Sequence, residues 1–288
     1  MSNTDAVPND MQATYWNGDA GQKWVRHQAD MDTSLSGVAA MLMQHAAVQP
    51  GERVIDVGCG TGVTLLDFAA RTGVAGRVLG CDVSAPMLAL ARERVAEAGH
   101  KHVEVVEADA QTHDFEAGTY DLVASRFGVM FFDDPVTAFA NMRRALRPDG
   151  RLAFACWAAP ADNPYFTVQQ QVAVARLGPI EPPPPGAPGP FAFADADLVR
   201  GILIDAGFAD IEIHDGRPHL LGSNSAQEQA EFNIAMGPAA RVIQDKNATA
   251  DDIAAIRDGI AEAFSAFVSD GRVRIPSRQH YVVARNPG

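Results

Sequence analysis

Three glycines and an aspartate near residue 60 have the types and spacing of a ligand-binding turn. Gly58, Gly60 and Gly62 stand at alternate positions directly after a short apolar stretch that contains Asp56. Glycine lacks a Cβ atom, so its backbone can turn tightly and approach a ligand closely. A helical pattern follows, and the amides at the start of such a helix point toward whatever occupies the turn. The stretch therefore predicts a buried parallel strand that ends in a ligand-binding loop.

The spacing of these glycines separates two classes of nucleotide-binding turn. A dinucleotide fingerprint has the pattern G-x-G-x-x-G, which requires glycine at position 63, where this chain has Val63. The chain instead has G-x-G-x-G, with Asp56 two residues before the first glycine. The segment from 56 to 62 resembles motif I of the class I S-adenosylmethionine (SAM) methyltransferases. This resemblance implies a set of cofactor-binding residues in the turn: Asp56, Gly58, Cys59 and Gly60.

A second acidic residue ends the next apolar strand. Asp82 follows Gly62 by 20 residues, at the expected end of the second strand of a βαβ unit. A carboxylate in that position can accept hydrogen bonds from both hydroxyls of a ribose. Capping the following helix is the alternative role, but Ser84 already has a suitable residue type for that. Val83 and Met87 follow and are expected near the adenosyl group, with a core position as the alternative for Met87.

Two further strand ends supply candidate cofactor residues. A third apolar strand precedes Asp109 and Ala110. The resemblance implies that Asp109 accepts a hydrogen bond from the adenine amino group and that Ala110 offers its backbone amide. The strand 120–125 leads into Arg126 and Phe127, at the edge where open α/β sheets bind ligands. Arg126 and Phe127 are therefore expected to face the cofactor and the substrate.

The order of the predicted elements defines the fold class. Five strands alternate with four helices over residues 51–157, which predicts a doubly wound, mostly parallel sheet. The turn Leu-Arg-Pro-Asp-Gly-Arg-Leu that precedes the fifth strand resembles the segment after the motifs in the ubiquinone/menaquinone-biosynthesis-like small-molecule methyltransferases. The resemblance implies a seven-stranded Rossmann-like sheet completed by two late strands, the last one antiparallel. We expect residues 1–50 to form an N-terminal helical flap, 51–158 the SAM-binding core, and 159–288 helical cap insertions plus those two strands.

The N-terminal flap concentrates aromatic side chains. Residues 1–10 are polar and are expected to be loosely attached. Tyr15, Trp16 and Trp24 follow within a mostly helical stretch. Such a flap can pack permanently on the body, or it can close over the cofactor and exclude water, and the resemblance favours contact with the cofactor. His27 lies in the same stretch and is a weak candidate for a catalytic base, a structural role being the alternative.

A proline-rich segment separates the predicted core from the cap. Residues 179–190 contain seven prolines and two glycines. Such a run is incompatible with helix or central strand. We expect either an exposed linker or a stiff loop that crosses the mouth of the site.

Composition excludes several classes of partner. The formal net charge is −13 and no Lys/Arg cluster is present, which argues against a nucleic-acid substrate. No apolar run has the length of a membrane span, and the first residues lack the pattern of a signal peptide, so a cytoplasmic location is expected. The three cysteines have no metal-ligand spacing, and no metal site is predicted.

These residues predict a SAM-dependent methyltransferase that transfers a methyl group to a small-molecule acceptor by in-line displacement. A base is needed only where the acceptor must lose a proton. One alternative is a SAM-binding protein that does not transfer methyl groups. Another, a nicotinamide-dependent oxidoreductase, is disfavoured by Val63 and by the acids at 82 and 109. Aromatic residues expected at the site indicate a partly apolar or planar acceptor: Tyr15, Trp16, Phe127, Phe131, Phe132 and Trp157.

Overall fold

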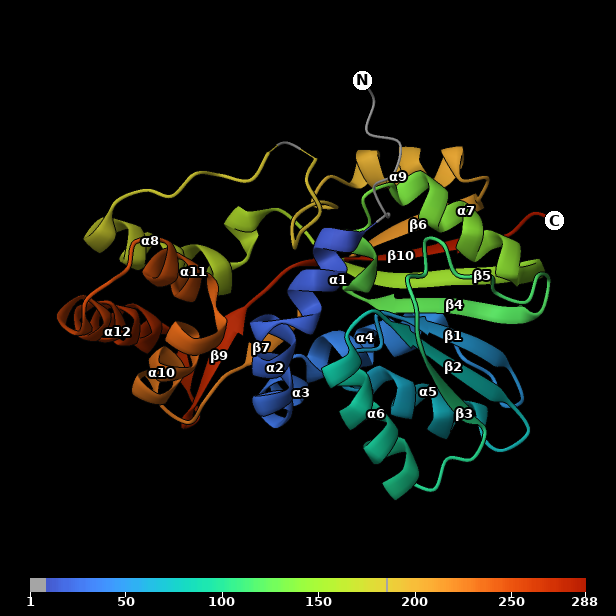
Figure 1. The fold of residues 1–288 in the computed structure, drawn as a ribbon, viewed down its shortest axis with the longest axis horizontal. Helices are drawn as coiled ribbons and strands as arrows, with labels where there is room; N and C mark the ends of the chain where they lie inside the picture. The colour runs from blue at the N-terminus through green and yellow to red at the C-terminus, as the bar shows by residue number, and fades with distance from the viewer. Residues whose placement is uncertain (1–8, 185) are drawn as a thin grey trace.

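Seven strands form the central sheet of the computed structural model, which describes residues 9–184 and 186–288. The strand order is β3-β2-β1-β4-β5-β10-β6, with β1 to β5 parallel and β10 antiparallel to both of its neighbours (Figure 1). The strands are Arg53–Val57 (β1), Arg77–Asp82 (β2), Val103–Glu107 (β3), Tyr120–Arg126 (β4), Leu146–Trp157 (β5), Ala209–Gly216 (β6) and Gln279–Arg285 (β10). This topology confirms the expected doubly wound sheet and its antiparallel last strand.

Helices cover both faces of this sheet, which explains why its central strands are largely buried. α7 and α9 lie on one face, and α4, α5 and α6 lie on the other (Figure 1). These helices span Ser36–Ala46 (α4), Val63–Thr72 (α5), Ala85–Glu97 (α6), Pro135–Ala145 (α7) and Ala196–Asp205 (α9). In β1, β2 and β4 nearly every residue is buried, as expected for parallel strands that are covered on both faces. The chain reverses its direction of winding between β1 and β4, so a crevice forms at their carboxyl ends.

Helices before and after the core form the remaining layers. Three short helices precede α4: Asp10–Asn17 (α1), Asp19–Arg26 (α2) and Gln28–Ser34 (α3). A separate helical lobe contains Pro164–Leu177 (α8), Ala226–Met236 (α10), Pro238–Asp245 (α11) and Ala250–Phe264 (α12). Figure 1 shows α1 to α3 between this lobe and the sheet. Three 3-10 turns complete the helical elements: Gly128–Phe131, Pro160–Asp162 and Ser265–Phe267.

Two strand assignments differ from the expectation. β5 begins at Leu146 and so includes the turn expected to precede it, because Leu146 already pairs with Tyr120 of β4 before an irregularity in the register. A small second sheet, absent from the expected elements, contains His219–Leu221 (β7), Val268–Ser269 (β8) and Arg272–Pro276 (β9) in the order β7-β9-β8. Its strands are two to five residues long, and β7 pairs with β9 across more than 50 residues of sequence, whereas β8 and β9 form a short hairpin. Such short strands give little local pattern in the sequence.

The described residues contain no candidate membrane span and no candidate metal centre. No helix among them combines the length and the apolar character needed to cross a bilayer. No group of three or more His, Cys, Asp or Glu side chains within residues 9–184 and 186–288 is arranged to hold a metal ion.

Candidate cofactor site

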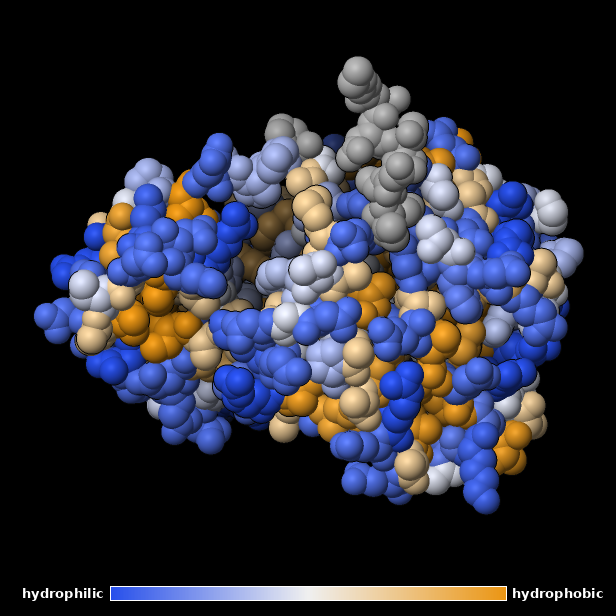
Figure 2. Space-filling view, viewed as in Figure 1, coloured by the Kyte–Doolittle hydropathy of each residue, from blue (hydrophilic) through white to orange (hydrophobic). Residues whose placement is uncertain are grey.

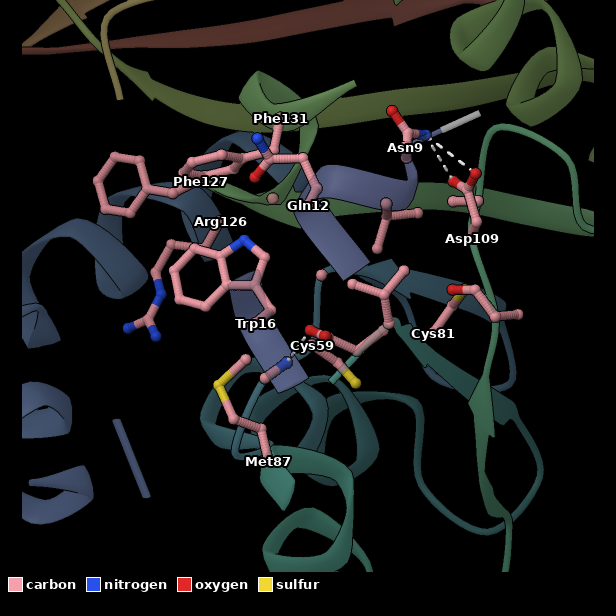
Figure 3. Close-up of a pocket in the computed structure, with 18 of the residues that line it drawn as sticks. Asn9, Gln12, Trp16, Cys59, Cys81, Met87, Asp109, Arg126, Phe127 and Phe131 are labelled. Atoms are coloured by element: carbon pink, nitrogen blue, oxygen red, sulfur yellow. Dashed lines mark hydrogen bonds between the residues drawn. The ribbon is translucent and has the colours of Figure 1, made fainter. Parts of the chain in front are cut away.

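A cavity opens at the carboxyl ends of β1, β2 and β4, under the helices α1 and α2 (Figure 3). Its walls come from five places in the chain: the flap, the glycine turn, the end of β2, the loop after β3 and the end of β4. The candidates that line it are Trp16, Trp24, Gly58, Cys59, Gly60, Asp82, Val83, Met87, Asp109, Ala110, Arg126 and Phe127. Figure 2 shows a hollow between the helical lobe and the N-terminal helices, with hydrophobic residues at its floor.

The glycine turn has two sides with different steric demands. Gly58 and Gly60 have φ angles of 67° and 54°, a region that side-chain-bearing residues rarely adopt. A Cβ atom on Gly58 would lie 2.7 Å from the Cα atom of Gly128, so two backbones touch there. A Cβ atom on Gly60 would meet only the sulfur of Met87, at 3.8 Å. The open side of the turn at Gly60 therefore faces the cavity, as a ligand-binding turn requires.

The carboxylate of Asp82 is held by backbone amides at the wall of the cavity. Its Oδ2 atom accepts from the amide of Gly60 at 2.8 Å, and its Oδ1 atom accepts from the amide of Ser84 at 2.9 Å. Burial raises the pKa of Asp82, while these amide bonds lower it. Each oxygen is used once by these bonds, so each keeps an acceptor site. Two free acceptor sites on a fixed carboxylate suit the two adjacent hydroxyls of a ribose.

Ser84 has a different role from the expected one. It occupies the N-cap position of α6, but its hydroxyl donates to the carbonyl of Trp16 at 2.7 Å and does not cap the helix. Asn17 adds a donor bond to the carbonyl of Val83 at 2.8 Å and accepts from the amide of Ala85 at 2.9 Å. The end of α1 is thereby fastened to the beginning of α6. This attachment places the indole of Trp16 over the cavity, edge-on to Phe131 with ring centres 5.5 Å apart (Figure 3).

Three candidates do not reach the cavity. Tyr15 is 59% exposed. It directly precedes Trp16 on α1, so its side chain points about 100° away from that of Trp16 and does not line the cavity. Asp56 lies beneath the turn, fully buried, where it accepts a hydrogen bond from the hydroxyl of Thr64 at 2.7 Å. His27 packs edge-on against Phe232 in the helical lobe, with ring centres 5.6 Å apart. None of the three lines the cavity, and no histidine does so among the described residues.

Arg126 places a cation in the wall of the cavity. Its Nη1 atom is buried and has no hydrogen-bond partner among the described residues. Burial lowers the pKa of Arg126, and the charges of Asp32, Asp56 and Asp67 oppose this effect. None of these acids forms an ion pair with it among the described residues, so the guanidinium has an unused donor that suits an anionic group.

Phe127 continues the wall toward the helical lobe. It has a φ angle of 71°, a strained conformation for a bulky residue, and its ring stacks on Trp157 with a centre distance of 4.4 Å. Edge-on contacts then lead from Trp157 to Phe166 at 5.0 Å and from Phe166 to Phe191 at 4.8 Å. A continuous row of aromatic rings therefore runs from the cofactor cavity to the segment that follows the prolines.

Several lining residues were not anticipated from the sequence. Asn9 and Gln12 belong to the flap, and Leu35 ends the third N-terminal helix. Asn9 contradicts the expectation of a loosely attached N-terminus, since it is buried; residues 1–8 lie outside the described residues. No sequence signal distinguished Asn9, because its neighbours are polar and its partners lie about 100 residues or more away.

The buried carboxyl group of Asp56 predicts how the stability of the protein depends on pH. Burial raises its pKa to about 7, although the bond from Thr64 and the charge of Arg126 lower it. The unfolded carboxyl ionises near pH 4, so between pH 4 and pH 7 the folded protein binds more protons, and stability falls as pH rises through that window. Asp56→Asn should remove about 2.5 kcal/mol of this loss between pH 5 and pH 8. Urea unfolding at both pH values measures it; equal pH dependence in both proteins would contradict the pKa assignment.

The fold and this cavity define a Rossmann-like domain that binds a nucleoside-containing cofactor. Residues 54–150 match a methyltransferase domain family. Nocamycin O-methyltransferase of Saccharothrix syringae is 30% identical over 190 residues, which are 62% of this chain and 67% of that protein. The chain therefore belongs to the class I SAM-dependent methyltransferase family.

Other relatives support this membership. The ubiquinone/menaquinone biosynthesis C-methyltransferase UbiE of Teredinibacter turnerae is 34% identical over 119 residues, 41% of this chain and 48% of that protein. The chain spans about half the length of several of the curated relatives that it matches. A putative methyltransferase structure from Bacillus halodurans C-125 shares the fold, with a TM-score of 0.56, 24% identity and coverage of 87% of this chain and 99% of that one.

Proposed function

We propose that this protein transfers a methyl group from SAM to a small-molecule acceptor by in-line displacement. The observation that carries the proposal is the fixed carboxylate of Asp82 beside the open glycine turn. The ribose diol of an adenosyl cofactor would bind the Asp82 carboxylate, and its narrow methionine chain would lie against the glycine turn. Both features lie in one cavity, next to a second acid at Asp109 and an unused cationic donor at Arg126.

The proposed contacts divide the cofactor into three parts. Asp82 would hold the ribose hydroxyls, with Val83 and Met87 beside the adenosyl group. Asp109 and Ala110 would bind the adenine. The turn from Gly58 to Gly60 would hold the methionine portion, and Arg126 would bind its carboxylate. All of these residues line the cavity.

SAM supplies a methyl group that its sulfonium already activates toward a nucleophile. The work left to the chain is to orient the acceptor and to exclude water. Trp16, Phe127 and Phe131 line the cavity with aromatic rings. Trp24 also lines it, and its ring centre lies 6.0 Å from that of Trp16. Since no histidine lines the cavity among the described residues, we assign no general base to His27 or to any other histidine.

The row of rings from Phe127 to Phe191 supports a planar, partly apolar acceptor. Flat rings stack on aromatic side chains, and each such pair adds to the energy of simple burial. One relative is an O-methyltransferase and another is a C-methyltransferase, and oxygen, carbon, nitrogen and sulfur nucleophiles all remain open as the acceptor atom of this chain. We propose that residues 1–50 act as a flap over the cofactor and that residues 159–288 contribute the helical lobe that shapes the acceptor site.

The acidic charge and the cysteines support two further parts of the proposal. A net charge of −13 disfavours binding to nucleic acid, because phosphate groups repel such a surface. Cys59, Cys81 and Cys156 are buried free thiols. They suit a reducing compartment, and we propose a cytoplasmic location.

The direct test has two steps. Calorimetry first measures binding of S-adenosylhomocysteine, the product form of the cofactor. Mass spectrometry then follows its formation from SAM with a panel of phenols, hydroxyquinones and amines. Binding together with product formation on a planar acceptor supports the proposal. Binding without transfer to any acceptor in the panel would favour the alternative of a SAM-binding protein that does not methylate, and absence of binding would contradict both.

The Asp82 carboxylate gives a quantitative test of the cofactor contacts. We expect Asp82→Ala to weaken S-adenosylhomocysteine binding by about 1.5–3 kcal/mol, the cost of losing hydrogen bonds to a charged group. Calorimetry on both proteins measures the difference, and circular dichroism checks that the variant is folded. Unchanged affinity in a folded variant would remove Asp82 from the ribose site.

A further inference from the structure

Asn9 closes the end of the cavity that Asp109 marks. This residue precedes α1, is 4% exposed and lines the cavity. Its side-chain nitrogen donates to both carboxylate oxygens of Asp109, at 3.0 and 2.9 Å, and to Oε1 of Gln111 at 3.2 Å (Figure 3). The flap thus supplies a polar side chain to the acid that faces the proposed adenine site.

The position of Asn9 is fixed from its other side as well. Its backbone amide donates to Oδ2 of Asp133 at 2.7 Å, and its Oδ1 atom accepts from the amide of Asp133 at 2.6 Å. Its φ angle of 57° lies in the left-handed region, which asparagine adopts more readily than most residues. The side chain and amide of Asn9 are therefore fully engaged, which indicates a built contact and not a chance approach of the N-terminus.

The hydrogen bonds of Asp109 leave one acceptor site open. Its Oδ1 atom accepts from Asn9 and, at 2.9 Å, from the amide of Gln111. Its Oδ2 atom accepts only from Asn9 among the described residues. An ionised carboxylate offers about four acceptor sites, so one site remains, on Oδ2. An exocyclic amino group is a donor that can use this site.

We infer that Asn9 is a positioning residue for recognition of the adenine base: it holds the Asp109 carboxylate so that the remaining acceptor site receives the amino group of the cofactor. The inference rests on the proposed function. Because Asn9 leads directly into the helix that carries Trp16, recognition of the base and coverage of the cavity share one segment of the chain. A cofactor whose base lacks the amino donor should lose the contact with Asp109.

The test compares S-adenosylhomocysteine with S-inosylhomocysteine, in which a carbonyl oxygen replaces the amino group. Calorimetry gives the ratio of the two dissociation constants for the wild-type protein and for Asn9→Ala. Asn17→Ala is the matched control, because Asn17 fastens the other end of α1 to Val83 and Ala85 but does not line the cavity. We expect Asn9→Ala to reduce the preference for the adenosyl ligand by roughly tenfold, and Asn17→Ala to leave it unchanged.

The outcomes separate the possible roles of Asn9. An equal loss of affinity for both ligands in Asn9→Ala would mean that Asn9 only attaches the flap, and tighter binding of S-adenosylhomocysteine would mean that it competes with adenine; either result overturns the inference. Binding of neither ligand to the wild-type protein would overturn the proposed function, and this inference with it. If Asn9→Ala does not fold, Asn9→Asp keeps the acceptor for the amide of Asp133 while it removes the donor to Asp109, and an unchanged preference in that folded variant would likewise overturn the inference.

Discussion

Gly60→Val is expected to lower the affinity for S-adenosylhomocysteine by about 100-fold or more while the sheet stays folded. A branched side chain would fill the open side of the turn. Only the sulfur of Met87 lies within 4 Å of a Cβ atom at this position, so the added methyl groups would point into the cavity and not into the core. The φ angle of 54° is strained for a β-branched residue and adds a backbone cost of roughly 1–2 kcal/mol. Calorimetry measures the affinity, and thermal unfolding measures the fold.

Gly58→Ala is the matched control for that experiment. Its Cβ atom would lie 2.7 Å from the Cα atom of Gly128, a contact between two backbones that cannot relax cheaply. We expect this smaller substitution to lower the melting temperature more than Gly60→Val does. Normal affinity in a folded Gly60→Val variant would show that the turn does not contact the cofactor.

Arg126→Gln is expected to weaken S-adenosylhomocysteine binding by roughly 10- to 100-fold, the cost of a lost charge-assisted hydrogen bond. Binding of 5′-methylthioadenosine should stay within about twofold, because that molecule lacks the amino and carboxylate groups while it keeps the adenosine and the thioether. The reason is the buried Nη1 atom of Arg126, which has no partner among the described residues and lies in the cavity wall.

Arg94→Gln controls for a general change of charge near the site. Arg94 donates to the carbonyl of Thr61 and to the carboxylate of Asp32, both at 2.7 Å, and it does not line the cavity. We expect it to affect both ligands to the same small extent. If Arg126→Gln weakens both ligands equally, Arg126 does not bind the carboxylate and acts only through the electrostatics of the site.

Membership of the family does not identify the methyl acceptor, because the matched segment covers only part of the chain. The family match ends at residue 150, within β5. The helical lobe, the small sheet and the aromatic residues Phe166 and Phe191 all follow it. Under the proposal that these later elements shape the acceptor site, the identity of the acceptor depends on residues that the shared motif does not specify.

The turn and the strand ends could be predicted because their signals are local. A glycine with positive φ, a buried strand and an acid at a strand end are each specified within a few residues. Gly58, Gly60, Asp82, Asp109 and Arg126 therefore reached the cavity wall as expected. The parallel order of the strands also followed, since short alternating strands and helices can be joined in few ways.

The contacts of the flap could not be predicted, because they join segments that are distant in the chain. Ser84 has the right type for a helix cap, yet its hydroxyl bonds to Trp16, 68 residues earlier. The helical period decided between Tyr15 and Trp16, and only one of two adjacent residues can face the cavity. The proline-rich segment illustrates the same limit, since its composition excludes regular structure but does not say where the chain passes.

What the sequence determined by itself is the sheet, the cofactor turn and the acids at the ends of its strands, since short-range geometry and the apolar pattern specify each of them. Only the tertiary structure decided that Asn9 holds Asp109, that Asp56 lies beneath the turn, and that His27 faces the helical lobe. Such placements depend on which side chains the folded chain brings into contact. That depends on how the helices pack on the finished sheet, and no local pattern of residue types encodes it.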